Sequence, residues 1–258
     1  MNGHDSESSS MLAPGNPLQI ASHGHLQHAL QRNPARQAEL GQYFTSEHTA
    51  LFMASLFSDT QSPVNLLDAG AGSGILTAAF VINICRKAVR PATIYATAVE
   101  KDESLLPLLN DTLNRCGEWC RNYDVDFRFE IIKDDFILYA AEQVAAGDLF
   151  RQPVRYSHAI LNPPYGKINS QSKHRQALRT VKIETVNLYT AFLALAVKFL
   201  QTDGELVAIT PRSFCNGPYY RPFRRLLLGS MALRHIHVFN SRSSVFREDE
   251  VLQENIIY

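Results

Sequence analysis

A strand, a glycine-rich turn and a helix follow one another in residues 64–76, and this unit constrains the fold more than any other stretch. The apolar run before Asp68 predicts a buried strand. Gly70, Gly72 and Gly74 permit positive φ and a close approach of the backbone to a ligand. The Gly-x-Gly-x-Gly spacing differs from the Gly-x-Gly-x-x-Gly of dinucleotide sites, and a carboxylate in the loop would repel a pyrophosphate. The loop therefore favours a cationic ligand or hydroxyl groups.

Strands alternate with helices along the rest of the chain. Apolar or alternating segments predict further strands at residues 93–99, 127–132, 157–161, 204–211, 235–239 and 251–258. Helical patterns cover residues 47–57, 104–121 and 186–200. This alternation predicts an α/β fold with a doubly wound, mostly parallel, seven-stranded sheet of the Rossmann-like kind.

Composition limits the function classes. Lys plus Arg and Asp plus Glu both number 25 among 258 residues, which counts against extensive nucleic-acid contact by this chain alone. No apolar run reaches membrane-spanning length, and four scattered cysteines lack zinc-site spacing. We therefore expect a reduced, cytoplasmic protein with no metal site and no membrane partner.

The N-terminal segment differs from the rest. Residues 1–35 are rich in Ser, Pro, Gly, His and Gln, so we expect a tail that is disordered or loosely docked, ahead of one domain at residues 36–258. His23, His25 and His28 have no acidic or cysteine partner nearby, which favours a solvated, irregular segment over a metal site.

Acidic residues follow two more strands of the predicted sheet. Glu100, followed by Lys101, is placed to accept hydrogen bonds from both ribose hydroxyls. Asp135 could accept from an adenine amine while Phe136 packs on its ring. Each acid could instead cap a helix. Together with Asp68, three acids at one edge of a parallel sheet outline a nucleoside pocket.

The fourth strand ends in Asn162-Pro163-Pro164-Tyr165. The two prolines make the turn stiff. The side-chain oxygen of Asn162 and the carbonyl of Pro163 are both acceptors suited to an –NH2 group, and Tyr165 offers a flat face for a planar ring. Taken alone, the same residues could simply form a Pro-Pro turn. The polar, basic residues 167–182 that follow are expected to be a loop, either mobile over phosphates or merely solvated.

The order of three segments resembles the γ class of N6-adenine DNA methyltransferases, which belong mostly to bacterial restriction–modification systems. These segments are Gly41-Gln42-Tyr43-Phe44-Thr45, then Leu67-Asp68-Ala69-Gly70-Ala71-Gly72-Ser73-Gly74, then Asn162-Pro163-Pro164-Tyr165. The resemblance covers about residues 38–258. It implies a class I methyltransferase fold with a reversed final strand, S-adenosylmethionine as cofactor, and adenine in a specific site of double-stranded DNA as target.

The resemblance also implies roles for single residues. The methionine end of the cofactor would lie against Gln42, Tyr43, Phe44 and Thr45, and the loop below the sulfonium would comprise Asp68, Ala69, Gly70 and Gly72. The adenosine part would be held by Glu100, Lys101, Asp135 and Phe136. The target base would be held by Asn162, Pro163, Pro164 and Tyr165, with Asn162 also near the cofactor, and Phe246 would pack on the flipped base.

The chain departs from this class at its end, since it stops at the last strand where such enzymes continue into a target-recognition domain. We therefore expect this chain to be the catalytic half of a longer protein, or a truncated gene product, whose partner is a missing recognition domain, a subunit or a linked nuclease. Protein glutamine N5-methyltransferases share Asn-Pro-Pro-Tyr, because a carboxamide –NH2 fits the same acceptors. Methylation of RNA adenine and a truncated, non-catalytic S-adenosylmethionine-binding domain are further alternatives. A C5-cytosine methyltransferase would need a Pro-Cys nucleophile, which the sequence lacks.

Overall fold

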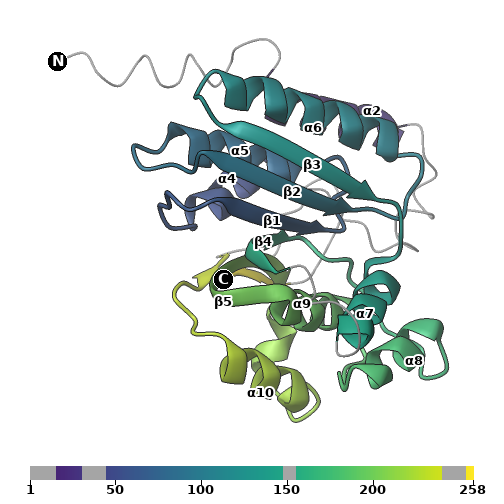
Figure 1. Cartoon of the computed structure of the whole chain (residues 1–258). Helices are drawn as coiled ribbons and strands as arrows, with labels where there is room; N and C mark the ends of the chain where they lie inside the picture. Colours follow the sequence, from purple (N-terminus) through teal and green to yellow (C-terminus); the bar gives the residue numbers. More distant parts are fainter. Residues whose placement is uncertain (1–15, 31–44, 148–154, 240–253) are drawn as a thin grey trace.

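Seven strands form one sheet in the computed structural model, which describes residues 16–30, 45–147, 155–239 and 254–258. The sheet order is β3-β2-β1-β4-β5-β7-β6 (Figure 1). The strands are β1 (Val64–Ala69), β2 (Thr93–Val99), β3 (Asp126–Ile132), β4 (Tyr156–Leu161), β5 (Leu200–Pro211), β6 (His237–Val238) and β7 (Asn255–Ile257). Among these residues, no helix has the length and apolar character needed to cross a membrane.

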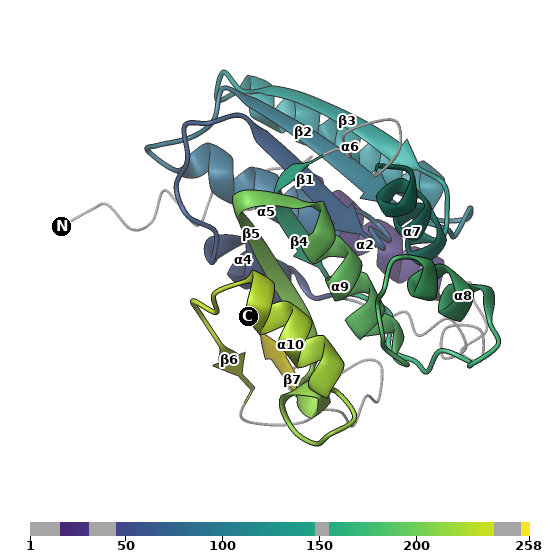
Figure 2. The same ribbon diagram turned by 60° about the horizontal axis from the view of Figure 1, so that its bottom comes forward.

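The first five strands run parallel, and the last strand in the chain is reversed. β7 inserts between β5 and β6 and pairs antiparallel with both, at the edge that Figure 2 brings forward. The predicted doubly wound sheet with a reversed final strand is therefore confirmed. Because parallel strands end at one edge, the segments after β1, β2, β3 and β4 converge there.

Helices cover both faces of the sheet (Figures 1 and 2). One layer contains α2 (Pro17–Leu30), α4 (Glu47–Ser55), α5 (Ile75–Arg86) and α6 (Leu106–Arg121). The other contains α7 (Phe136–Gly147), α8 (Lys173–Thr180), α9 (Leu188–Phe199) and α10 (Arg221–Ser230), with a short 3-10 turn at Arg212–Cys215 after β5.

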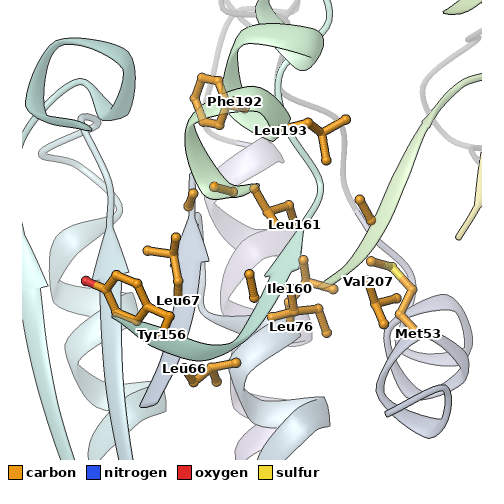
Figure 3. Packing of buried hydrophobic residues seen from close by; sticks show 14 of the residues in the cluster. Met53, Leu66, Leu67, Leu76, Tyr156, Ile160, Leu161, Phe192, Leu193 and Val207 are labelled. Atoms are coloured by element: carbon orange, nitrogen blue, oxygen red, sulfur yellow. The ribbon is translucent and has the colours of Figure 1, made fainter. Parts of the chain in front are cut away.

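The central strands are buried on both faces, which explains their continuous apolar runs. Figure 3 shows Leu161 of β4 beneath Phe192 and Leu193 of α9, while Ile160 lies beside Leu76 of α5. Successive side chains of a strand point to opposite faces, so β4 joins both helix layers in one core.

The expectation of an irregular tail is wrong for its central part, because Pro17–Leu30 form α2. Asn16 precedes the helix, and its Oδ1 accepts a hydrogen bond from the Leu18 amide at 2.9 Å. Leu18 and Ala21 are buried, and the helix packs on α5 and α6. Weak helical propensity is thus offset by tertiary packing. Residues 1–15 and 31–44 lie outside the described part.

The basic segment after β4 is also not wholly a loop, since Lys173–Thr180 form α8. Ser172 caps this helix by accepting a hydrogen bond from the Arg175 amide at 3.2 Å. Leu178 is fully buried and anchors the helix beside α7. Only one residue of this helix, Leu178, is buried, so the apolar periodicity is too weak to predict the helix.

Candidate functional site

A cavity of about 630 Å³ opens at the edge where β1, β2, β3 and β4 end. Its lining includes eight residues that the sequence analysis singled out: Gly70, Gly72, Glu100, Lys101, Asp135, Phe136, Asn162 and Pro164. His25, Val99, Leu105, Asp134 and Phe192 complete it. The structure thus brings most of the predicted cofactor residues together.

The glycine loop has the backbone conformation that its sequence predicts. Gly70, Gly72 and Gly74 have φ of 75°, 57° and 81°. The Gly70 amide donates to the carbonyl of Val99 at 2.9 Å, which ties the loop to the end of β2. Residues with a Cβ adopt this left-handed region only at a cost, so the loop depends on glycine.

Asp68 lies beneath this loop and is completely buried. Its Oδ2 accepts hydrogen bonds from the amide and hydroxyl of Thr77, at 3.2 and 2.7 Å. Its Oδ1 has no hydrogen-bond partner among the described residues. Burial raises the pKa of Asp68 to about 7, and the nearby charge of Glu100 adds to this, whereas the Thr77 hydrogen bonds lower it. An ionised Asp68 would favour a cation close by.

Glu100 connects the end of β2 to the glycine loop. It is 4% exposed, and its Oε2 accepts from the Gly72 amide at 2.8 Å, while Oε1 accepts from the Asp102 amide at 2.7 Å. Burial raises the pKa of this carboxyl above its ordinary value. Each carboxylate oxygen can accept a second hydrogen bond, so Glu100 can brace the loop and still bind hydroxyl groups in the cavity.

Asp135 caps α7 and lies in an ion-pair cluster at the cavity. Its Oδ1 accepts from the Ile137 amide at 3.0 Å, and its Oδ2 lies 3.0 Å from Nε2 of His174 and 3.7 Å from Nζ of Lys101. Burial acts to raise the pKa of Asp135, but the hydrogen bond and charge of His174, with the charge of Lys101, hold it below its ordinary value. The capping alternative therefore describes part of what this carboxylate does.

Phe136 gives the cavity an aromatic wall. It is 2% exposed, and its ring centroid lies 5.0 Å from that of Phe192 on α9. The sequence analysis missed Phe192 because it lies within a uniformly apolar helix, where nothing distinguishes a cavity-lining residue from a core residue.

Asn162 stands directly after β4, and its amide group is held from one side. Its Nδ2 donates to Oγ1 of Thr45 at 2.8 Å, and Thr45 is 4% exposed just before the N-terminus of α4. The contact joins the end of the Gly41–Thr45 segment to Asn-Pro-Pro-Tyr across 117 positions of sequence. It directs the amide nitrogen toward Thr45 and Oδ1 away from it.

A second cavity, of about 1,080 Å³, lies on the Tyr165 side of the turn. Tyr165 is 8% exposed, and its ring makes an edge contact with Tyr189 of α9, with centroids 6.3 Å apart. The lining comprises Tyr165, Gly166, Lys167, Asn187, Tyr189, Pro211, Arg212, Ser213, Tyr220 and Glu254. Asn-Pro-Pro-Tyr therefore contributes residues to both cavities.

The second cavity has a polar wall that the sequence analysis missed. Nδ2 of Asn187 donates to the Tyr220 hydroxyl at 2.8 Å, and the hydroxyls of Tyr189 and Ser213 lie 3.0 Å apart. These residues come from α9, from the turn after β5 and from the start of α10. Since no sequence spacing links these three segments, only the fold brings them together.

Eight predicted site residues do not line either cavity. Gln42, Tyr43, Phe44 and Phe246 lie outside the described residues. Thr45, Asp68, Ala69 and Pro163 are described and buried, but neither lining includes them.

Comparison with known proteins identifies the family. The model of the Eco57I restriction-modification methylase family matches residues 99–246, which is more than half of the chain. The chain belongs to this family. The family and the fold imply S-adenosylmethionine as the cofactor, in agreement with the sequence analysis.

Two curated relatives are similar over most of this chain. The Type II methyltransferase M.BsuBI of Bacillus subtilis is 46% identical over 224 residues, and M.PstI of Providencia stuartii is 45% identical over 222 residues. Each match covers 86% of this chain and 43% of the relative. The chain thus spans less than half the length of these two relatives.

Solved structures confirm the class I methyltransferase fold. A class I S-adenosylmethionine-dependent methyltransferase from Listeria monocytogenes aligns with a TM-score of 0.64 at 13% identity, covering 94% of this chain and 67% of that one. The methyltransferase subunit of a type I restriction-modification system from Streptococcus thermophilus aligns with a TM-score of 0.59 at 17% identity, covering 83% and 44%.

Proposed function

We propose that this chain carries the methylating site of a γ-class DNA methyltransferase, which modifies the exocyclic N6 of adenine as part of a restriction–modification system. The observation that carries the proposal is the position of Asn-Pro-Pro-Tyr. Asn162 and Pro164 line the cavity suited to the cofactor, and Tyr165 lines the second cavity. A base in the second cavity would bring its amine to the turn that separates it from the cofactor.

The first cavity fits S-adenosylmethionine by its donor and acceptor groups. Glu100 offers carboxylate oxygens for ribose hydroxyls, and Phe136 with Phe192 offers aromatic faces for adenine. The buried carboxyl of Asp68 lies below the glycine loop, where a positive sulfonium would favour its ionised form. When bound, the cofactor supplies an electrophilic methyl group.

The chemistry of the turn favours an amine as the methyl acceptor. The lone pair of adenine N6 is delocalised into the ring, so N6 is a weak nucleophile. Oδ1 of Asn162 and the carbonyl oxygen of Pro163 would each accept a hydrogen bond from one N–H of the amine. These two hydrogen bonds would draw the nitrogen toward a tetrahedral arrangement. The bound cofactor would supply the methyl group for the new N–C bond, and the amine, held by these two acceptors, would release one proton to solvent. Positioning, rather than a strong base, is the main requirement.

The target base must leave the duplex to reach this turn. Extrusion costs a few kcal/mol and needs a stacking partner. Tyr165 is suited to that role because its ring is buried and is supported at the edge by Tyr189. We keep Phe246 as the second stacking residue in this proposal, on the family resemblance alone.

Recognition of a specific DNA sequence is assigned to a further region or subunit, and a linked nuclease belongs to the same proposal. The equal numbers of acidic and basic residues support this, because sequence-specific DNA binding usually needs a basic surface. In the same proposal, residues 36–258 form the catalytic domain.

A labelling experiment tests the proposal. The protein is incubated with methyl-labelled S-adenosylmethionine and mixed bacterial DNA, and the DNA is digested to nucleosides. We expect label in N6-methyladenine, and its loss in Asn162→Ala. Label in another methylated base would contradict the assignment. Label on a protein release factor, but none on DNA, would move the assignment to glutamine.

If the chain binds S-adenosylmethionine but labels no DNA, the result would instead indicate that it needs a recognition region in order to methylate DNA. Adding the separately produced unmatched part of a relative such as M.BsuBI, of which the match covers 43%, distinguishes this case. Label on DNA that appears only after this addition would support the assignment of DNA recognition to a further region. Absence of label even then would favour the non-catalytic alternative.

A further inference from the structure

The helix α2 reaches the cofactor cavity from a part of the chain that precedes every recognised methyltransferase segment. His25, in the second half of this helix, lines the cavity together with Lys101, Leu105 and Asp135. The residue is partly exposed. Neither the sequence resemblance nor the matched family region, residues 99–246, includes this helix.

A close helix–helix contact fixes the position of His25. A Cβ added to Gly24 would lie 2.3 Å from Cδ1 of Leu108 on α6, so any larger residue there would force the Leu108 side chain to move or the two helices to separate. Leu18 and Ala21, which are buried, hold the preceding turns of α2 against the same layer. His25 follows Gly24 directly, and its placement therefore depends on this contact.

The contact also shows which part of the cavity His25 faces. Helix α6 begins at Leu106, directly after the cavity-lining Leu105 and shortly after Glu100 at the end of β2. α2 packs mainly on α6, and Gly24 meets Leu108 in the first turn of that helix, so His25 lies close to the end of β2. Glu100 at this strand end would hold the ribose, and Asp135 after β3 would hold the adenine.

We propose that His25 binds the adenosine half of S-adenosylmethionine and that α2 is a structural part of the cofactor site. This inference rests on cofactor binding alone and does not require methyl transfer to DNA. The imidazole ring provides a flat face that can pack against a purine or a ribose, and ring nitrogens that can hydrogen-bond to either. Asp134, Asp135 and Lys101 line the cavity with it and would contact the polar edges of the same nucleoside.

Equilibrium binding to the full chain tests the proposal, with a matched control on the same helix. S-adenosylmethionine and 5′-methylthioadenosine, which lacks the amino-acid part, are titrated by calorimetry into the wild type, His25→Ala and His23→Ala. His23 is exposed and does not line the cavity. We expect His25→Ala to weaken both ligands about 5- to 10-fold, the loss typical of one stacking contact, and His23→Ala to bind within about twofold of the wild type.

Hydrogen exchange provides a second, independent measurement. S-adenosylmethionine is expected to slow amide exchange across residues 17–30 in the wild type. Gly24→Leu, which forces α2 away from Leu108, should remove that protection and weaken the ligand at least as much as His25→Ala. Circular dichroism checks that the sheet domain of this variant remains folded.

The outcomes separate this inference from the proposed function. Equal affinities for wild type and His25→Ala, or no protection of residues 17–30 by bound ligand, would overturn the role of α2 while leaving the methyltransferase proposal intact. A wild type that binds no S-adenosylmethionine would overturn both. A wild type that binds the cofactor but methylates no DNA would still test His25 fully.

Discussion

At the scale of single residues, one hydrogen bond decides how the candidate catalytic amide is presented. Thr45 accepts from Nδ2 of Asn162 at 2.8 Å, which leaves Oδ1 on the opposite side. Family resemblance assigns Thr45 to the methionine end of the cofactor. In the structure it contacts Asn162 and is absent from the lining of the first cavity. We therefore infer that Thr45 acts mainly by orienting the amide.

Thr45→Val removes this acceptor at nearly constant volume. Loss of a buried hydrogen bond costs about 1–3 kcal/mol. We expect methyl transfer to fall roughly 10- to 100-fold while the affinity for S-adenosylmethionine changes less than about threefold. Thr45→Ser keeps the hydroxyl and should retain most of the rate. Parallel measurements of kcat and of cofactor Kd distinguish the two roles, since a cofactor-binding role would raise Kd in Thr45→Val.

Asp68 predicts a pH dependence of stability. Burial raises its pKa to about 7, well above the ordinary value of 3.8. Between these values the folded protein holds a proton that the unfolded chain releases, so the free energy of unfolding falls as pH rises from about 4 to 7. Full ionisation corresponds to roughly 4 kcal/mol at most.

Urea unfolding of the wild type and Asp68→Asn at pH 5 and pH 8 measures this contribution. Asp68→Asn, which cannot ionise, should lose less stability than the wild type between the two pH values. An identical fall in both proteins would show that Asp68 does not titrate in this range.

At the scale of elements, the glycine loop is shaped both by backbone conformation and by the packing of α6. Gly74 has φ of +81°, and a Cβ there would lie 2.9 Å from Cδ1 of Leu109. Gly72 has φ of +57°, and a Cβ there would meet no atom within 4 Å. A residue with a Cβ would therefore adopt an unfavourable left-handed conformation at either position, but only at Gly74 would it also clash with a neighbouring side chain.

Alanine at each position separates the two effects. We expect Gly72→Ala to lower the free energy of unfolding by about 1–2 kcal/mol, the cost of a left-handed residue. Gly74→Ala should lower it by about 1 kcal/mol more, because Leu109 must move. Denaturant unfolding without cofactor measures both, and equal losses would contradict a packing role for Gly74.

The elements show which parts of the fold the sequence could predict. The five parallel strands lie within a few residues of their predicted positions, because each contains an apolar or alternating segment bounded by turn residues. Helix α2 was missed because its histidines and glycine obscure the apolar positions and its stability comes from contacts with α5 and α6. Helix α8 was missed because it has only one buried residue, which gives no apolar periodicity.

The residues of the candidate site likewise include some that the sequence predicts and some that it does not. Glu100 and Asp135 were predictable because parallel strands place their ends at one edge, whatever the rest of the fold does. His25, Phe192 and the polar wall of the second cavity were not, since they come from helices and turns that carry no motif of their own.

At the scale of the whole molecule, the two cavities have different requirements. The first is lined by residues of four strand ends, of α2 and of α9, which offer donors, acceptors and aromatic faces for a small molecule. The second offers Lys167 and Arg212, but Arg212 is paired with Glu254. Among the described residues that line it, this leaves Lys167 as the one basic side chain outside an ion pair to attract a phosphate backbone.

This difference between the two cavities predicts that the chain can bind the cofactor without binding DNA tightly. In electrophoretic mobility shifts at physiological salt, we expect this chain alone to bind duplex DNA no more tightly than non-specific complexes do, with Kd of about 10⁻⁶ M or weaker, and to lose that binding as salt rises. The reason is its zero net charge, with 25 basic and 25 acidic residues. Calorimetry on the same preparation should still detect S-adenosylmethionine, so that poor folding is excluded as a cause. Tight binding to one sequence among competitor DNA would mean that recognition residues lie within these 258 residues, and the assignment of recognition to a further region would then be wrong.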